Sequence, residues 1–345
     1  MAVVFFDGFE SANSDTTLLH KWELIRLGSP VYEATSGRRS SRGIRITNPT
    51  TRIFKNIPAL DTYIAGGAFK PTTGQSDQAI FILFLTDIPT ASHIEIRGET
   101  DGNISVTRSG TQLGITTDNP LTFDDFQFIE ARVFIDNSAG SVEVRLNGST
   151  ILNLTSVDTR NGSSTEVSFI GFSGHTGGTG VAIDDVYVLN ESGDAPQNTF
   201  LGDIRIDTIK PSADGGLSQL PTLFPITPTT SFDKVDEEFT DDDTTYIEST
   251  AVNQVSTFAY EDAPAVVGGA TVLAVQVATR IRKTEIGPRN MTSLQRFSAA
   301  NTVFQSHGVP TENTTFLSVH PTNPRTGSAW GETEIDALEV GLEVL

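Results

Sequence analysis

Three acidic side chains near the carboxyl end have the spacing that comes closest to a catalytic arrangement. They are Glu334, Asp336 and Glu339. Hydrolysis of a glycosidic bond with retained configuration needs two carboxyl groups about 5–5.5 Å apart, one as nucleophile and one as acid and base. On a regular strand Glu334 and Glu339 point to opposite faces, because side chains alternate along a strand. They would converge only across a bulge, so we interpret this stretch as an amphipathic terminal strand.

The remaining reactive side chains show no catalytic or metal-binding spacing. The chain has no cysteine, which excludes disulfides, a thiolate nucleophile and a cysteine zinc site. Its five histidines are scattered, and no Gly-x-Ser-x-Gly elbow is present. The glycine-rich residues 172–180 lack the lysine of a phosphate-binding loop, so we interpret them as a turn, with contact to a sugar at the sandwich rim as the alternative. We therefore predict that the protein is not an enzyme.

Four large aromatic side chains are candidates for stacking on a sugar ring. They are Trp22, Tyr32, Tyr63 and Trp330. Large aromatic residues more often fill hydrophobic cores, because they bury the most apolar surface. We therefore expect these four residues to be core residues.

The charge of the chain excludes one class of partner. The formal net charge is −20, with 23 basic and 43 acidic side chains. Affinity for nucleic acid depends largely on Lys and Arg side chains that neutralise phosphates. We therefore expect no nucleic-acid partner and no attraction to anionic membranes. An acidic chain is instead suited to solubility and to cation binding.

The sequence contains no membrane-spanning or export segment that we can identify. No run of about 18 apolar residues is present, so no helix is expected to cross a membrane. The amino terminus has no basic region and too short an apolar run for a signal peptide. We expect the product to be made in the cytoplasm.

Alternation of apolar and polar residues predicts an all-β fold. Residues 129–135 place Ile, Ala, Val and Ile on one face, and residues 142–146 repeat the pattern after a turn at 137–140. This pattern indicates a β-hairpin. Residues 78–86 are apolar on both faces and predict a central strand. Many short strands with almost no helical periodicity predict a two-sheet sandwich or jelly roll.

The length of 345 residues favours two domains. The polar residues 190–198 are the expected boundary, which gives a β-sandwich over 1–195 and a second β-rich domain over 196–345. In the second domain we expect a strand over 202–209 and a long surface loop over 211–231. Further strands are expected at 271–282, 315–320 and 337–345.

Residues 1–190 resemble the concanavalin A-like lectin/glucanase superfamily, close to laminin-G-like and MAM-type domains. The opening Phe-Asp-Gly-Phe-Glu-Ser at 6–11 and the closing Val-Ala-Ile-Asp-Asp-Val-Tyr-Val at 181–188 carry this resemblance. Residues 37–46 and the hairpin over 128–148 are also similar to these domains. The cysteines that frame many animal members are missing. The resemblance implies a jelly-roll sandwich that contacts a host-surface glycan or a neighbouring subunit.

The same resemblance implies a structural calcium ion. In MAM-like domains the acidic residues of the first and last strands meet near a cation, which here implies Glu10 with Asp184 or Asp185. Calcium prefers oxygen ligands, including carboxylates from distant segments. Adjacent residues of a strand point to opposite faces, so only one of the two aspartates is expected to reach the ion.

The second half resembles segments of structural and tail proteins of double-stranded DNA bacteriophages. Residues 201–209, 241–246 and 333–340 carry this resemblance. It implies a virion protein, as a tail fibre, a head spike or a capsid decoration, assembled with other virion proteins after synthesis in the host cytoplasm. Such parts are symmetric homo-oligomers, and we favour a homotrimer.

Two alternatives to this interpretation remain open. Residues 334–339 resemble the E-x-D-x-x-E signature of bacterial laminarinases and lichenases, which would imply a polysaccharide-degrading glycoside hydrolase of the virion. In those enzymes, however, the signature lies within the sandwich, whereas here it lies outside the lectin-like half. The other alternative is a capsid cement protein that binds no ligand.

Overall fold

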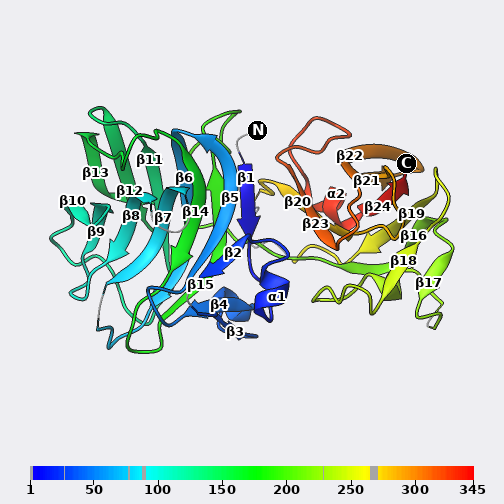
Figure 1. Ribbon diagram of the computed structural model, residues 1–345, viewed down its shortest axis with the longest axis horizontal. Helices are drawn as coiled ribbons and strands as arrows, with labels where there is room; N and C mark the ends of the chain where they lie inside the picture. The colour runs from blue at the N-terminus through cyan, green and yellow to red at the C-terminus, as the bar shows by residue number, and fades with distance from the viewer. Residues whose placement is uncertain (1–2, 27, 77, 88–90, 228, 265–270) are drawn as a thin grey trace. The chain divides into compact units, whose positions relative to one another are not determined.

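The computed structural model describes residues 3–26, 28–76, 78–87, 91–227, 229–264 and 271–345 of the chain (Figure 1). The chain divides into two compact units, Met1–Ile206 and Asp207–Leu345. In both units nearly all regular structure is β, which confirms the expected all-β fold class. Among the described residues, no helix is long and apolar enough to cross a membrane.

The first unit is a sandwich of two antiparallel sheets. The eight-stranded sheet has the order β13-β12-β11-β6-β15-β4-β3, and β1 pairs with β15 beside this path. Its strands are β1 (Val3–Asp7), β3 (Val31–Glu33), β4 (Gly43–Ile46), β6 (Thr62–Pro71), β11 (Gln127–Phe134), β12 (Gly140–Leu146), β13 (Ser149–Val157) and β15 (Val181–Leu189).

The second sheet of this unit has seven strands in the order β10-β9-β8-β7-β14-β5-β2. They are β2 (Leu24–Arg26), β5 (Arg52–Leu60), β7 (Ala79–Asp87), β8 (Ala91–Gly98), β9 (Ile104–Arg108), β10 (Thr111–Ile115) and β14 (Val167–Ser173). Two short helices, α1 (Asp15–Leu18) and the 3-10 turn η1 (Arg38–Ser40), lie in connections between strands.

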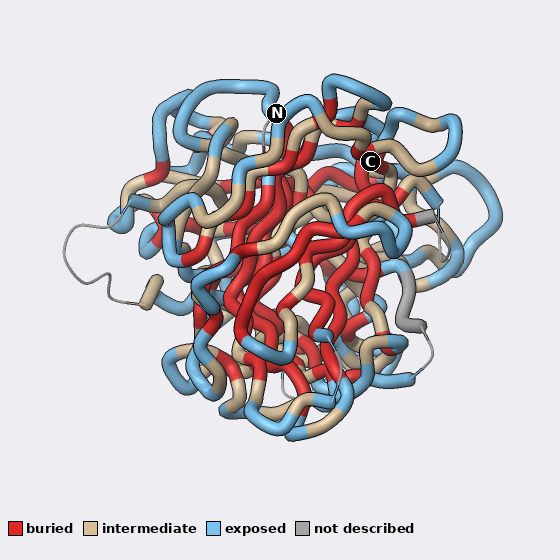
Figure 2. Tube along the Cα trace, turned by 90° about the vertical axis from the view of Figure 1, so that its left-hand side faces the viewer, coloured by how far each residue is buried: buried red, intermediate tan, exposed pale blue. Residues whose placement is uncertain are grey.

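The core of the sandwich lies between the two sheets. Phe69 of β6 places its ring 5.1 Å from Phe81 of β7 and 6.0 Å from Phe172 of β14. Trp22 packs on Phe172 at 5.8 Å and donates its indole N–H to the buried carboxylate of Asp7 at 2.9 Å. Buried stretches of strand run through the interior, with exposed segments at the periphery (Figure 2). Burial of the apolar side chains on these inner faces drives the pairing of the sheets.

The strands predicted from alternation are confirmed. β11 and β12 pair in register from Ile129 opposite Leu146 to Phe134 opposite Ser141, and every second residue of β12 is buried. β7 lies between β8 and β14 and is buried on both faces over most of its length. The local pattern of apolar residues, alternating in β11 and β12 and continuous in β7, was therefore sufficient to place these strands.

The second unit is built on a five-stranded sheet in the order β16-β19-β24-β21-β22, with two separate strand pairs, β17–β18 and β20–β23. Its elements are β16 (Pro211–Ser218), β17 (Thr222–Phe224), η2 (Phe232–Lys234), β18 (Tyr246–Glu248), β19 (Val255–Tyr260), β20 (Val275–Ile281), β21 (Asn290–Phe297), β22 (Ala300–Gly308), β23 (Thr314–His320), α2 (Glu332–Asp336) and β24 (Glu339–Val344).

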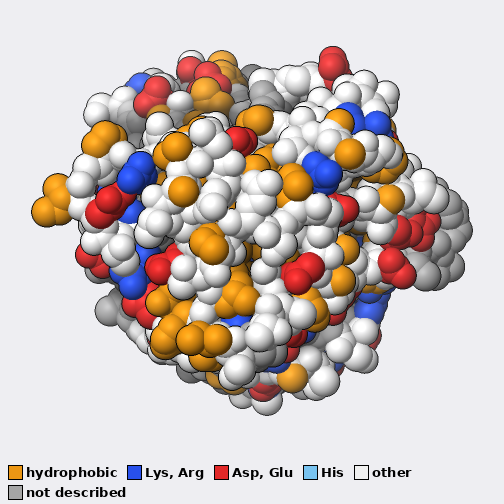
Figure 3. All heavy atoms as spheres, turned by 90° about the vertical axis from the view of Figure 1, so that its right-hand side faces the viewer, with side chains coloured by type: hydrophobic (Ala, Val, Ile, Leu, Met, Phe, Trp, Pro, Cys, Tyr) orange, Lys and Arg blue, Asp and Glu red, His pale blue; other side chains and the backbone are white. Residues whose placement is uncertain are grey.

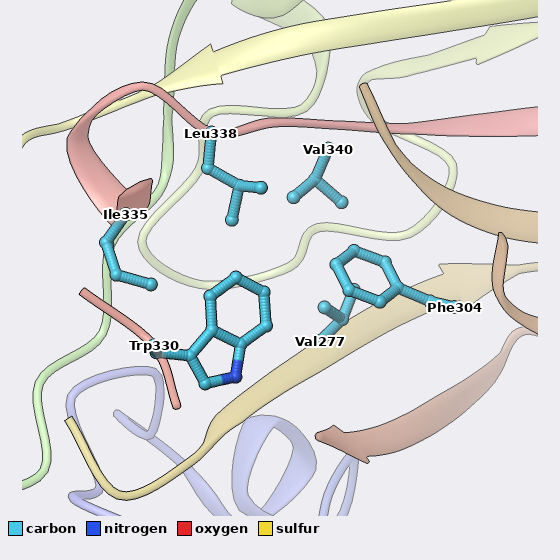
Figure 4. Packing of buried hydrophobic residues seen from close by; sticks show 6 residues of the cluster. All are labelled: Val277, Phe304, Trp330, Ile335, Leu338 and Val340. Carbon is cyan, nitrogen blue, oxygen red and sulfur yellow. The ribbon is translucent and has the colours of Figure 1, made fainter. Parts of the chain in front are cut away.

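This unit has a hydrophobic core of its own. Trp330 packs in one cluster with Ile335 of α2, Leu338, Val340 of β24, Val277 of β20 and Phe304 of β22 (Figure 4). Its indole N–H donates to the carbonyl of His320 at 2.8 Å, which satisfies the one polar atom of the ring.

The beginning of the second half differs from expectation. Residues 202–209 were expected to form a strand, but they contain no strand, and the first strand is β16 in the stretch expected to be a surface loop. The amides of Gly202 and Ile206 donate to side chains of the first unit instead of to a neighbouring strand. β16 is an irregular edge strand, where a proline at the first position is tolerated. The division of the chain accordingly follows Ile206, whereas the expected boundary followed residue 195.

Separate cores predict separate unfolding of the two units. Phe172→Ala should destabilise only the first unit and Trp330→Ala only the second, each by roughly 3–5 kcal/mol, because each removes a buried aromatic ring. Calorimetry of the full chain should show each variant lowering a different transition. A single transition lowered equally by both variants would contradict the division.

Candidate functional site

Acidic side chains gather where β1 ends beside a bulge in β15. The two strands are antiparallel, with Phe6 opposite Tyr187 and Asp7 opposite Val186, so the chain after β1 lies next to Asp184 and Asp185. The register of β15 against β6 shifts between Asp184 and Tyr187, which marks a bulge. Both aspartates are buried, at 1% and 3% exposed. The structure therefore brings the predicted residues of the first and last strands together.

The backbone around these acids is strained at four non-glycine positions. Phe9, Arg39, Ser40 and Asp185 have φ values of 64°, 55°, 64° and 49°, in the left-handed region. Non-glycine residues in this region cost of order 1 kcal/mol or more, and such residues concentrate at binding and catalytic sites. The surrounding hydrogen bonds hold this conformation in place.

Asp185 is neutralised by arginine. Its Oδ2 accepts from Arg38 Nη1 at 2.9 Å and lies 3.6 Å from Arg39 Nη1, and its Oδ1 accepts from the amide of Ile206 at 2.7 Å. Burial raises the pKa of Asp185, and the Ile206 amide and the two arginines oppose that rise. Asp185 is thus an ion-paired anchor for the segment that follows β15.

Asp184 and Glu10 have a different environment. Asp184 accepts from the amide of Arg38 at 2.7 Å and from Ser41 Oγ at 2.9 Å. Burial, together with the charge of Asp185, raises the pKa of Asp184 to about 7. Burial also raises the pKa of Glu10 to about 8, with contributions from the charges of Asp184 and Asp7. Glu10 and Asp184 are therefore close enough to repel one another, which a bound cation would relieve.

Two glycines leave room for clusters of oxygen atoms beside these acids. A methyl group on Gly8 would lie 2.5 and 2.8 Å from the two carboxylate oxygens of Glu10 and 2.7 Å from the carbonyl oxygen of Ile206. A methyl group on Gly37 would lie 2.4 Å from the Arg42 carbonyl oxygen and 2.6 Å from Asp184 Oδ2. Carboxylate and carbonyl oxygens are the donors that calcium prefers.

The oxygen atoms gathered here are therefore of the chemical types that bind calcium. Glu10 and Asp184 would supply the charge and the carbonyls of Ile206 and Arg42 the neutral oxygens, while Asp185 is held by its arginines. In the described part of the chain, no three His, Asp or Glu side chains lie close enough to hold a metal by themselves. A calcium ion would thus depend on backbone carbonyls, and its binding here stays a prediction.

The acids of the glycosidase-like signature are held in three separate places. Glu334 and Asp336 lie on α2 and Glu339 begins β24, so a helix interrupts the strand expected there. Glu334 caps the amide of Gly331 at 3.1 Å, and Asp336 accepts from the amide of Ala263 at 2.9 Å. Glu339 accepts from the amide of Gly216 and from Thr257 Oγ1, both at 2.8 Å. Each carboxylate thus holds backbone or side-chain donors of the fold.

The aromatic candidates lie mainly in the cores. Trp22, Tyr63 and Trp330 are at most 3% exposed. Tyr32 is partly buried and donates its hydroxyl to Asp15 at 2.7 Å, and burial with this contact raises the pKa of Tyr32. Of the glycine-rich residues 172–180, the first two end β14, and 174–180 form the turn that leads to β15, with left-handed backbone at three glycines.

Sequence reasoning missed a buried pair on the outer face of the eight-stranded sheet. Alternation along β11 places Glu130 on the face opposite its core neighbours Ile129 and Ala131. Glu130 and Tyr187 are nonetheless fully buried, and the Tyr187 hydroxyl donates to the Glu130 carboxylate. The residues that cover them come from beyond β15, so no local pattern could have revealed this pair.

Comparison with known proteins gives structural likenesses only. No protein-family description matches the chain, and no curated protein matches it. Among solved structures, a sialidase is 12% identical with a TM-score of 0.39, and the match covers 54% of this chain and 18% of that protein. Alginate lyase Aly36B is 7% identical with a TM-score of 0.37, covering 54% and 96%. A carbohydrate-binding module of Bacillus subtilis is 7% identical with a TM-score of 0.35, covering 49% and 96%.

The raised pKa values predict an unusual pH dependence. The folded unit binds the protons of Glu10 and Asp184 more tightly than the unfolded chain does, since their pKa values rise from 4.5 and 3.8 to about 8 and about 7. This stabilisation is complete below about pH 4 and is lost as the pH rises through about 7 and 8. In chelator, the melting midpoint of the first unit should therefore fall from pH 5 to pH 8.

Trp22 fluorescence in a Trp330→Phe background reports this midpoint, because Trp22 is then the only tryptophan. Glu10→Gln should flatten the pH slope, and Glu191→Gln, which changes an exposed acid, should leave it unchanged. A midpoint that rises over the same interval would show that Glu10 and Asp184 are ordinary ionised carboxylates.

Calcium should reverse the same loss of stability. At pH 7.5 we expect millimolar calcium to raise the melting midpoint of the first unit. At a hundredfold excess over the dissociation constant, the ion should add about 2.7 kcal/mol to the free energy of unfolding. Glu10→Gln and Asp184→Asn should each reduce this gain. If the wild type melts at the same temperature in calcium and in chelator, the site does not exist. The same conclusion holds if calcium shifts the midpoint of both variants as far as that of the wild type.

Proposed function

We propose that this protein is a non-enzymatic structural or attachment protein of a tailed-bacteriophage virion. The first unit contacts a host-surface glycan or a neighbouring subunit, and the second unit joins the chain to other virion proteins. The resemblance of residues 201–209 and 333–340 to phage structural proteins supports the location. The all-β architecture of both units is compatible with a fibre, a spike or a capsid decoration.

The observation that carries the non-enzymatic part is the placement of the three acids of the glycosidase-like signature. Retaining glycosidases need two carboxyls that face one substrate bond. Here Glu334 caps a helix, Asp336 binds a loop amide and Glu339 binds an edge strand. Acids committed to separate structural bonds are poorly placed to act on one substrate.

Surface charge supports a protein or glycan partner over nucleic acid. On the face drawn in Figure 3, Lys and Arg side chains are few and stand among acidic and uncharged ones. The overall charge of −20 acts in the same direction. A neutral saccharide or another virion protein meets no such electrostatic barrier.

Antibody labelling of purified virions, viewed by electron microscopy, tests the location. We expect labels at one defined position on the head or tail, and native mass spectrometry of the purified chain should give a homotrimer. Binding to an array of host-surface polysaccharides should separate glycan contact from a role as ligand-free cement. The absence of the protein from purified virions would overturn the proposal.

The contrasting function is a polysaccharide-degrading glycoside hydrolase. We expect no release of reducing sugar from host polysaccharide, and Glu339→Gln should leave that result unchanged. The same variant should lower the stability of the second unit by roughly 1–3 kcal/mol. Its amide oxygen still accepts the two hydrogen bonds from β16 and β19, but without the charge that strengthens them. Sugar release that disappears in Glu339→Gln would establish the hydrolase instead.

A further inference from the structure

The chain that follows β15 returns across the outer face of the eight-stranded sheet. Residues 200–206, which we call the strap, bind side chains of β11, β15 and the 37–41 turn. The amide of Leu201 donates to the Tyr187 hydroxyl at 3.3 Å, and the amide of Gly202 donates to Glu130 Oε1 at 2.8 Å. Tyr187 and Glu130 therefore hold the middle of the strap.

The far end of the strap is held by one arginine and one aspartate. Arg38 donates from Nη1 to the Ile204 carbonyl at 3.0 Å and forms an ion pair with Asp203. Asp185 accepts from the amide of Ile206 at 2.7 Å. At the near end, the guanidinium of Arg145 lies 4.0 Å from the centre of the Phe200 ring.

These contacts come from one set of side chains that holds residues 200–206. We call the side chains of Arg38, Glu130, Arg145, Asp185 and Tyr187 the strap groove. The strap has no strand pairing, so the groove holds it through side chains that meet its backbone and through two strap side chains, Phe200 and Asp203. Such contacts depend on the sequence of both partners, unlike a bare β-ladder.

The packing and burial of Glu130 and Tyr187 favour a strap groove that is occupied. A Cβ atom on Gly66 beneath it would lie 2.7 Å from the Tyr187 ring and 3.0 Å from Glu130 Cγ, so only glycine lets these side chains lie flat on the sheet. Glu130 and Tyr187 are fully buried, and Glu130 Oε2 makes no hydrogen bond within the described protein. Loss of the strap would remove hydrogen bonds from a buried carboxyl–phenol pair, so the groove favours an occupant.

We propose that the strap groove is a self-recognition site that also accepts the strap of a second copy of this chain. Residues 191–196, which precede the strap, are exposed and contain no helix or strand, so they can act as the hinge of an exchange. Each of these contacts forms equally with the strap of the same chain or of a second copy. The inference rests on the proposed role as a repeated subunit of a particle.

In such an exchange each copy gives its strap to one neighbour and receives the strap of another. The groove of one copy holds the strap of the next, and the two surfaces differ, so the contact is heterologous. A heterologous contact closes into a ring if its rotation permits, and a ring of three copies gives the homotrimer favoured above. No copy then keeps an empty groove or an unbound strap.

The test uses two full-length variants that are each defective in one half of the contact. Gly202→Pro disables the strap, because proline has no N–H for Glu130 and cannot adopt the φ of 75° found at Gly202. Glu130→Leu disables the groove, and Glu130→Gln is its matched control because the amide oxygen still accepts a hydrogen bond. Native mass spectrometry reads the assembly of each sample.

We expect the wild type and Glu130→Gln to form closed oligomers and each defective variant to stay monomeric alone. Their mixture should form a one-to-one dimer, in which the strap of the Glu130→Leu chain fills the groove of the Gly202→Pro chain. A fluorescent peptide of residues 198–208 should bind Gly202→Pro at least tenfold more tightly than wild type, whose groove is already filled.

A mixture that stays monomeric while the peptide binds would show that the groove acts only within one chain and would overturn the exchange. Oligomers that persist in both variants alone would assign assembly to another surface. If Gly202→Pro fails to fold, Gly202→Ala is the milder variant. It keeps the N–H that binds Glu130 and meets no atom within 4 Å, so only its left-handed backbone opposes it and it should reduce the oligomer fraction without abolishing it. Antibody labelling of virions tests the proposed function separately, because exchange is measured in solution.

Discussion

The bulge in β15 is the constraint on which the rest of the first unit depends. In a regular strand two consecutive aspartates would send one carboxylate into the core between the sheets, where an unpaired charge is strongly unfavourable. The bulge and the left-handed backbone of Asp185 give both carboxylates polar partners instead. Asp184 binds the 37–41 turn and Asp185 binds the strap. The last strand thereby fixes both the opening and the closing segments of the unit.

Buried carboxylates recur in this unit, and each accepts hydrogen bonds from its own set of partners. Asp7 accepts from Trp22 and pairs with Lys21, while Glu130 accepts from Tyr187 and from the strap. Hydrogen bonds to a charged group are worth about 1.5–3 kcal/mol, and losing one partner leaves a buried charge behind. These acids therefore act as fixed points for segments that have no strand partners. Some acidic residues of this chain thus stabilise its structure, in addition to the contribution of the net negative charge to solubility.

The sequence predicted strands whose pattern lies within a few residues, and it missed hydrogen bonds between segments far apart in the chain. Alternation at 129–135 and 142–146, with the turn between them, was sufficient to place β11 and β12 as a hairpin. The observed register keeps the apolar side chains on the core face, because a slip of one residue would expose all of them. The same alternation at Ile204 and Ile206 predicted a strand over 202–209, but these residues contain no strand. There the Ile206 amide donates to Asp185, more than 20 positions away along the chain. The Gly202 amide donates to Glu130, more than 70 positions away. Spacing of apolar residues at every second position indicates which face of a segment is buried. It does not indicate which atoms accept the hydrogen bonds of the segment's backbone amides.

For the candidate site, spacing and resemblance placed Glu10, Asp184 and Asp185 together, but only the structure separates their roles. The same geometry links the cation prediction to the strap. The Ile206 carbonyl that faces Glu10 belongs to the strap, and the Ile206 amide is bound by Asp185. If the strap supplies a ligand oxygen, calcium affinity and strap docking must strengthen one another by the same factor, because coupling free energies are reciprocal. An exchanged strap would then carry its carbonyl into the site of the neighbouring copy. The acids that begin and end the sandwich would in that case report whether its outer groove is filled.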